Sequence, residues 1–163
     1  MTNKSTLHFF CGKMAAGKST LAKTLAEKYN AILLVEDEWL SVLYPEQITN
    51  IPDYLEYSSR LQKLLSNHIK SILSSGVSVV LDFPANTESQ RNWFRVIFED
   101  TKSSHILHYV DKSDDKCKQQ LKKRSANMPE GSAFTTDKEF DAINKYFQAP
   151  VDAEGFNIAR YEQ

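Results

Sequence analysis

Residues 7–29 have the sequence LHFFCGKMAAGKSTLAKTLAEKY. The first five residues are a short apolar run, which is typical of a buried strand. From residue 17 the pattern changes, because Leu21, Leu25 and Tyr29 recur at the spacing of one helix face. The residues between the apolar run and the helix match G-x-x-x-x-G-K-[ST], and they are Gly12, Lys13, Met14, Ala15, Ala16, Gly17, Lys18 and Ser19. The stretch therefore predicts a strand, a glycine-bearing turn and a helix in direct succession.

This turn is a Walker A motif, the sequence pattern of phosphate-binding loops. Gly12 and Gly17 allow the backbone to curl tightly and to approach a ligand closely. The backbone N–H groups at the start of the following helix then line an anion site. We expect Lys18 to reach the β- and γ-phosphates of a nucleotide, Ser19 to bind Mg²⁺, and the nucleotide site to extend to Thr20. The alternative, a glycine turn followed by Lys-Ser by chance, does not account for the flanking strand and helix.

Strand-like and helical patterns alternate along the rest of the chain. Four more apolar runs predict strands, and they cover residues 31–35, 77–83, 105–110 and, more weakly, 156–161. Helices are expected near Trp39, from a cap at Asp53 with Glu56 to Gly76, after Thr87, over Ser113–Arg124 and after Thr136. Alternation of this kind indicates an α/β protein, a three-layer αβα P-loop NTPase fold with a five-stranded, mainly parallel sheet. No linker interrupts the pattern, so residues 1–163 are predicted to form a single domain with a short helical lid at about residues 124–136.

Composition narrows the class of protein. The 163 residues correspond to one domain, and 41% hydrophobic with 25% charged residues is the balance of a globular protein. Twenty Lys and Arg against 21 Asp and Glu give a net charge of -1, which does not indicate binding to nucleic acid by charge alone. Cys11 and Cys117 are predicted to be free thiols in a reducing compartment. No apolar signal segment follows the N-terminus and no run has the length of a membrane helix, so a cytoplasmic protein without a membrane partner is expected.

Asp82 ends the predicted strand at residues 77–83. A carboxylate at that place, behind a phosphate loop, can hold a water molecule of the Mg²⁺ shell. The alternative is an aspartate that simply begins a loop. We assign Asp82, with Ser19, to the metal site.

Three carboxylates, Glu36, Asp37 and Glu38, follow the predicted strand at residues 31–35 directly. The carboxyl end of that strand faces the ligand crevice of such a sheet. Carboxylates there would repel an acceptor that is itself a phosphate, but would suit an acceptor hydroxyl, which needs a base for its proton. Asp37 is the predicted base. The alternative is an acidic first helical turn that is favourable to the helix dipole.

Three more polar residues are assigned to the crevice. Arg124 precedes a helix break at residues 127–131, and an arginine on a mobile lid can neutralise the transferring phosphoryl group. A helix-terminal cation is the alternative for Arg124. Asn86 and Arg91 follow Asp82 and are predicted to contact the substrate, with an ordinary solvated surface as the alternative for both.

Several of these segments together resemble a known group of enzymes. The phosphate loop, VEDEW at 35–39 and LDFPANT at 81–87 with Arg91 are similar to small bacterial P-loop kinases, the zeta-toxin and chloramphenicol-phosphotransferase-like ATP-binding proteins. The bacterial polynucleotide 5′-kinase domain is a more distant relative. The resemblance extends from Leu7 to about Phe156. It implies ATP and Mg²⁺ as cofactors, Asp37 as the base for the acceptor and Arg124 as a lid arginine.

The sequence therefore predicts an ATP-dependent kinase that transfers the γ-phosphate of ATP to a hydroxyl of a small-molecule or nucleotide-like acceptor. The Asn-Lys-x-Asp pattern of guanine readers does not occur, which favours ATP over GTP. Three alternatives stay open: a regulatory P-loop ATPase that acts as a switch, a nucleotide-binding module without chemistry, and a polynucleotide 5′-hydroxyl kinase. A nucleic-acid acceptor is the less favoured choice, and the sequence does not name the acceptor.

Overall fold

Five parallel strands form one sheet in the order β2-β3-β1-β4-β5. The structure is a computed structural model that describes residues 4–162, so residues 1–3 and 163 of the predicted domain lie outside the described part. The strands are β1 (Thr6–Cys11), β2 (Ile32–Val35), β3 (Val79–Pro84), β4 (Ser104–Asp111) and β5 (Ile158–Glu162). All four strand pairings are parallel, so the predicted sheet is confirmed and is parallel throughout the described residues.

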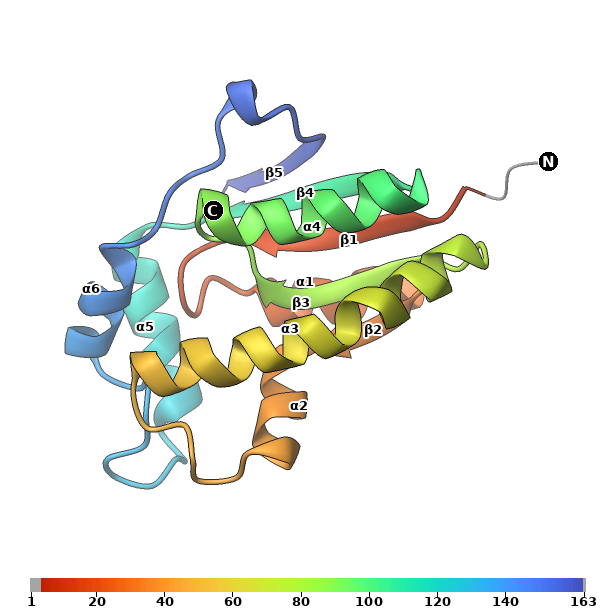
Figure 1. Ribbon diagram of the computed structural model, residues 1–163. Helices are drawn as coiled ribbons and strands as arrows, with labels where there is room; N and C mark the ends of the chain where they lie inside the picture. The colour runs from red at the N-terminus through yellow and green to blue at the C-terminus, as the bar shows by residue number, and fades with distance from the viewer. Residues whose placement is uncertain (1–3, 163) are drawn as a thin grey trace.

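Helices cover both faces of this sheet (Figure 1). They are α1 (Lys18–Tyr29), α2 (Glu36–Leu43), α3 (Ile51–Ser74), α4 (Glu88–Thr101), α5 (Asp114–Ser125) and α6 (Asp137–Asn144). In Figure 1, α3 and α4 lie in front of the sheet and α1 lies behind it, while α5 and α6 gather at the carboxyl ends of the strands. This arrangement confirms the three-layer αβα fold. No helix within residues 4–162 combines the length and the apolar character that a membrane crossing requires.

The central strand β1 contributes side chains to the cores on both sides of the sheet. Phe9 packs toward α4, where its ring stacks on Phe94 at 4.5 Å between centroids. Phe10 points to the opposite face and joins Ala22 and Leu25 of α1. A strand buried on both faces needs a nearly continuous apolar sequence, because successive side chains point to opposite sides. This explains why the run at residues 7–11 shows no alternation of apolar and polar residues.

One predicted helix boundary is wrong. The N-cap of α3 is Asn50, whose side chain accepts a hydrogen bond from the backbone N–H of Asp53 at 2.9 Å. Asp53 lies in the first turn instead, and its carboxylate accepts from the hydroxyl of Thr49. Asn and Asp are both good capping residues, which explains why the prediction placed the cap three residues too late.

The helix after β2 also starts earlier than expected. α2 begins at Glu36, directly after Val35, and not near Trp39. The three carboxylates of residues 36–38 therefore form its first turn, where the helix dipole favours negative charge.

Other predicted helix starts are confirmed. The Thr87 side chain accepts from the N–H of Gln90, and Thr136 forms a capping box with Glu139. Gly76, with a φ of 84°, follows the end of α3 as expected.

Two histidines are buried between the sheet and α1. His8 Nδ1 lies 2.9 Å from His108 Nε2, and His108 Nδ1 lies 2.9 Å from the hydroxyl of Tyr161. Burial lowers the pKa of both imidazoles, and that of His108 falls to about 4, because the neighbouring His8 acts in the same direction. His105, three residues earlier in β4, faces the other side of the sheet and stacks on Phe98, as the alternation of a strand predicts.

We predict that the imidazole of His108 stays neutral down to about pH 4. Because the folded-state pKa is lower than the unfolded-state value of 6.5, the contribution of His108 to stability is fully present above pH 6.5 and is lost as the pH falls toward 4. Nuclear magnetic resonance titration of the His108 ring resonances measures this midpoint directly. A midpoint near 6.5 in the folded protein would contradict the buried arrangement.

Candidate functional site

The predicted phosphate loop joins β1 to α1 at the carboxyl edge of the sheet. Gly12 leaves no room for a side chain, since a Cβ atom there would lie 2.9 Å from the carbonyl oxygen of Val110. Gly17 has a φ of 101°, in the region that glycine adopts without strain, and is the N-cap of α1. The two glycines therefore occupy the two positions of the loop that require this residue.

The N-terminus of α1 is not neutralised by side chains of its own helix. Among the six α-helices in residues 4–162, α1 is the one without an acidic residue in its first turn. Its N-cap makes no side-chain hydrogen bond, and Lys18 and Ser19 occupy the first turn. The partial positive charge of this helix end is thus directed at the loop, which fits a phosphate group.

Lys18 lies against the loop that it follows. Its Nζ donates hydrogen bonds to the carbonyl oxygens of Gly12 and Lys13, the latter at 2.8 Å. Burial lowers the pKa of the Lys18 ammonium, while the Asp82 carboxylate raises it. The charge is therefore held at the loop by backbone oxygens.

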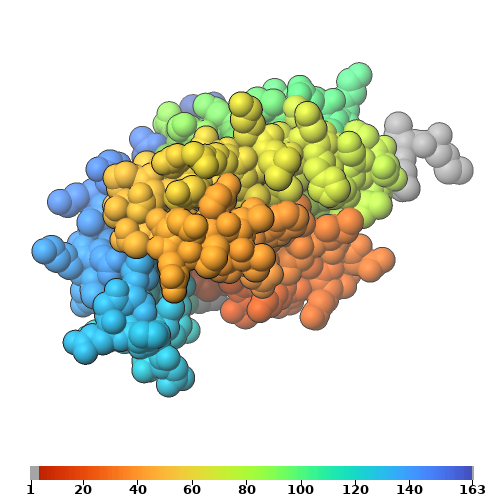
Figure 2. All heavy atoms as spheres, turned by 60° about the horizontal axis from the view of Figure 1, so that its bottom comes forward, coloured from red at the N-terminus to blue at the C-terminus, as the bar shows by residue number. Residues whose placement is uncertain are grey.

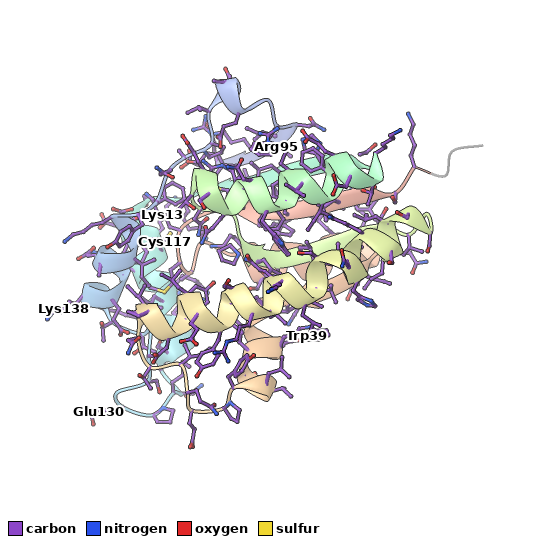
Figure 3. The ribbon with its side chains drawn as sticks, in the orientation of Figure 1. Lys13, Trp39, Arg95, Cys117, Glu130 and Lys138 are labelled. Atoms are coloured by element: carbon purple, nitrogen blue, oxygen red, sulfur yellow. The ribbon has the colours of Figure 1, made fainter. Side chains whose placement is uncertain are left out.

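The remaining loop residues have different surroundings. Lys13 extends toward α5 and forms an ion pair with Asp114 at 2.6 Å (Figure 3). Ala15 and Ala16 are buried, and Met14 packs against the same apolar cluster. These residues can therefore offer a ligand mainly their backbone N–H groups.

A cleft of about 390 Å³ opens beside the loop, on the side of β5. Its walls include Ala16, Thr20, Thr24, Val110, Gln120 and Tyr161. The volume is in the range of small-molecule sites. Thr20, which the sequence assigned to the nucleotide site, lines this cleft. Thr24, Gln120 and Tyr161 carried no sequence signal, because only the fold brings α1, α5 and β5 together here.

Ser19 and Asp82 meet as predicted. The Ser19 hydroxyl donates to Asp82 Oδ2 at 2.7 Å, although the two residues are 63 positions apart in the chain. A hydroxyl and a carboxylate are hard oxygen donors of the kind that Mg²⁺ prefers. This pair fits the predicted metal site, since both oxygens lie at the first turn of α1.

The acid cluster divides into a buried and an exposed part. Glu36 is 2% exposed, and its two carboxylate oxygens accept hydrogen bonds from the hydroxyls of Tyr54 and Ser58. Burial raises the pKa of Glu36 to about 7, although both hydroxyls oppose the shift. Tyr54 and Ser58 are one helical turn apart on α3, but nothing in the sequence pairs that face with Glu36, so sequence reasoning missed them.

Asp37 is exposed in the first turn of α2. The surrounding protein raises the pKa of its carboxyl by limiting hydration, and the Asp82 carboxylate acts in the same direction. Arg124 and Lys18 oppose the shift. Asp37 therefore lies within electrostatic reach of the predicted metal-binding carboxylate and of both predicted catalytic cations.

The segment between α5 and α6 lies beside the acid cluster. Arg124 is exposed near the C-terminus of α5, and its charge lowers the pKa of both Asp37 and Lys18. Beyond it, the Phe134 ring meets Tyr54 edge-on at 6.3 Å between centroids. Figure 2 shows this segment, in cyan, next to the orange and yellow residues of α2 and the start of α3. The predicted lid thus lies beside the acid cluster and the start of α3.

Two predicted substrate residues have other partners. Arg91 is fully buried, and its Nε forms an ion pair with Glu154 at 2.7 Å. The sequence prediction that Arg91 faces the crevice is therefore corrected, because its guanidinium has no exposed surface. Asn86 Oδ1 accepts a hydrogen bond from the Gly12 N–H at 2.9 Å. Its role toward a substrate stays a prediction.

The chain is similar to known families and structures. Residues 7–150 match the family model described as an AAA domain. A candidate kinase from Chloroflexus aurantiacus J-10-fl is 17% identical and superposes with a TM-score of 0.75 over 98% of this chain and 88% of that one. The APS kinase CysC of Mycobacterium tuberculosis in complex with AMPPNP and APS is 16% identical, with a TM-score of 0.65 over 98% and 88% of the two chains. Kti12 of Chaetomium thermophilum in complex with ADP-AlF3 is 13% identical, with a TM-score of 0.68 over 96% and 88%. No curated protein matches the sequence.

Glu36 generates a prediction about stability and pH. Its folded-state pKa of about 7 exceeds the ordinary value of 4.5, so its contribution to stability is fully present below pH 4.5 and is lost as the pH rises toward 7. We expect the unfolding free energy of the wild type, relative to Glu36→Gln, to fall by about 3 kcal/mol over that interval. Urea unfolding of both proteins from pH 4 to 8 measures the difference. A difference that does not change with pH would mean that Glu36 has the same pKa in the folded and the unfolded protein.

Proposed function

The chain belongs to the AAA domain family, and from this premise we propose that it is an ATP-dependent phosphotransferase acting on a hydroxyl acceptor. The observation that carries the proposal is the contact of Ser19, in the first turn of α1, with Asp82, whose charge also raises the pKa of Asp37. A hydroxyl and a carboxylate 2.7 Å apart suit the metal of a nucleotide, and a second carboxylate beside them suits an acceptor.

In the proposed complex, the phosphate loop and the adjoining cleft bind different parts of the nucleotide. The triphosphate would lie against the N–H groups of the loop, where Lys18 supplies a positive charge. The purine would enter the cleft of about 390 Å³, against the side chains of Thr20, Gln120 and Tyr161. In support, two similar proteins have solved structures with nucleotide ligands, AMPPNP and ADP-AlF3.

Ser19 and Asp82 are the proposed holders of Mg²⁺, Ser19 through its hydroxyl and Asp82 through the carboxylate. A bound Mg²⁺ neutralises phosphate oxygens and so makes the terminal phosphoryl group easier to transfer. Lys18 and Arg124 add positive charge from the protein itself, and the pKa effects of both on Asp37 indicate that they act on the same small volume.

Asp37 is the proposed general base. The acceptor hydroxyl gives its proton to the Asp37 carboxylate while its oxygen forms a bond to the γ-phosphorus of ATP. The bond between that phosphorus and the β–γ bridging oxygen breaks, and ADP leaves with the electron pair. Limited hydration and the nearby Asp82 raise the pKa of Asp37, which makes it a better proton acceptor than an ordinary surface aspartate.

The charge of the crevice limits the class of acceptor. Asp37 and Glu38 are exposed in the first turn of α2, and their charges would repel a phosphate group brought close to them. A neutral hydroxyl avoids this repulsion. We therefore propose a sugar, an alcohol or a nucleotide-like molecule whose reacting end is a hydroxyl.

Asp82 gives the first test of this proposal. We expect Asp82→Asn to lower phosphoryl transfer and to raise the Mg²⁺ concentration for half-maximal activity about tenfold or more, because the amide cannot supply the negative charge. The measurement is a Mg²⁺ titration of ATP turnover. Asp100→Asn, which removes a carboxylate that pairs with Lys70 between α3 and α4, is the matched control. An unchanged titration for Asp82→Asn would remove this residue from the metal site.

An Asp37 variant distinguishes a kinase from a regulatory ATPase that acts as a switch. We expect Asp37→Asn to bind Mg·ATP with wild-type affinity and to lose about 10²–10⁴-fold in transfer, because the amide cannot take the proton. Calorimetry with ATP gives the first quantity. Incubation with sugars, alcohols, nucleosides and a 5′-hydroxyl oligonucleotide, followed by mass spectrometry for a phosphorylated product, gives the second.

Glu38→Gln is the control for the Asp37 experiment, since Glu38 is the other exposed carboxylate of the same helical turn. Loss of ATP binding in Asp37→Asn would assign Asp37 to the metal or to the fold. ATP hydrolysis without a phosphorylated product from any acceptor would favour the switch ATPase.

A further inference from the structure

Asn86 connects three separate segments through three different polar groups. Its Oδ1 accepts from the N–H of Gly12 at 2.9 Å, and its own N–H donates to Gln90 Oε1 at 2.8 Å. Its carbonyl oxygen accepts from the N–H of Gln148, also at 2.8 Å. The first residue of the phosphate loop is thereby joined to α4 and to the segment that follows α6.

Arg91 also bonds to residues of this junction. Its Nη1 donates to the carbonyl oxygens of Ala85 and Gln148, at 3.0 and 2.8 Å. Its Nε is bound by Glu154 at 2.7 Å. A wholly buried guanidinium is costly unless it is paired and hydrogen-bonded, and these partners satisfy its Nε and Nη1, while Nη2 has no partner among the described residues. Asn86 therefore lies between two residues, Ala85 and Gln148, that one buried charge binds together.

Gly12 is bonded to both Asn86 and Lys18. On one side a Cβ atom at Gly12 would meet the Val110 carbonyl at 2.9 Å, so the backbone is already in close contact with β4. On the other side its N–H is bound by Asn86. Its carbonyl oxygen accepts from the ammonium of Lys18. The bond from Asn86 thus holds the N–H side of Gly12, the residue whose carbonyl oxygen binds the Lys18 ammonium.

We propose that Asn86 is a positioning residue for nucleotide binding and phosphoryl transfer, acting through Gly12 on the phosphate loop. This inference rests on the proposed function only in that the loop holds the nucleotide. It replaces the sequence-based expectation of a direct substrate contact, because the side-chain oxygen is committed to the loop. The rigid partners around Asn86 make it a fixed point from which the start of the loop is oriented.

Three variants test the proposal. Asn86→Leu has nearly the same shape but no acceptor for the Gly12 N–H, whereas Asn86→Asp keeps an acceptor in the same place. Asn92→Leu makes the first substitution at an exposed position of α4 and is the matched control. The readouts are the hydrogen-exchange rate of the Gly12 amide, the dissociation constant of Mg·ATP by calorimetry, and the thermal midpoint of unfolding.

We expect Asn86→Leu to accelerate exchange of the Gly12 amide and to weaken Mg·ATP binding about tenfold, the effect of one lost hydrogen bond. Asn86→Asp should keep the Gly12 amide protected, and Asn92→Leu should behave as the wild type. An Mg·ATP affinity within twofold of the wild type for Asn86→Leu overturns the proposal, and a defect limited to transfer would then make Asn86 an acceptor contact. If both Asn86 variants lower the thermal midpoint and expose Gly12 alike, the role is only structural and the proposal is likewise overturned.

The proposed function is tested separately, by the Mg·ATP binding and the phosphoryl transfer of the wild type. A wild type that binds Mg·ATP but phosphorylates no hydroxyl contradicts the kinase and leaves the positioning role of Asn86 to be decided by its variants. A wild type that does not bind Mg·ATP contradicts both.

Discussion

The close approach of Gly12 to the Val110 carbonyl is the contact from which the site is built. It lets β1 and β4 run side by side to the point where the chain turns into the phosphate loop. A side chain at residue 12 would push the loop away from β4, and the N-terminus of α1 would move with it. Because β1 is the middle strand of the sheet, such a shift would also disturb the apolar layers on both faces. In this protein, therefore, a change in the geometry of the loop also changes the packing of the core.

Charge is arranged around the loop in opposing groups. The N-terminus of α1, Lys18 and Arg124 supply positive potential, while Asp37 and Asp82 supply negative potential within reach of it. Glu36 would add a third negative charge, but its burial raises the pKa to about 7 and keeps much of that charge out of the crevice near neutral pH. The acid cluster that looks uniform in sequence thus contains one buried, hydrogen-bonded carboxyl with a raised pKa and two exposed carboxylates.

The parts of this architecture that the sequence predicts are those governed by local rules. The Walker A pattern, the alternating strands and helices and the caps at Thr87 and Thr136 each depend on residues that are neighbours in the chain. The meeting of Ser19 with Asp82 follows too, because both lie at the carboxyl edge of a parallel sheet. Arg91 could not be predicted, since its partner Glu154 is 63 residues away and nothing local distinguishes a buried arginine from an exposed one. The same holds for Tyr54, whose bond to Glu36 depends on how α3 crosses α2.

The segment around α5 and α6 meets the loop through polar contacts as well as through the buried apolar cluster that contains Ala15 and Ala16. Asp114, in the first turn of α5, binds Lys13 of the loop at 2.6 Å and Asn144 of α6 at 3.4 Å. Asp114 and Lys13 are both partly exposed, and ion pairs of this kind contribute little to stability. The buried contacts of Gly12 and Arg91, by contrast, leave the other side of the loop little freedom. The loop is therefore held by buried contacts on both sides, by Gly12 toward the sheet and by its alanines toward α5 and α6, and such a phosphate cradle can keep its shape while an exposed group such as Arg124 moves.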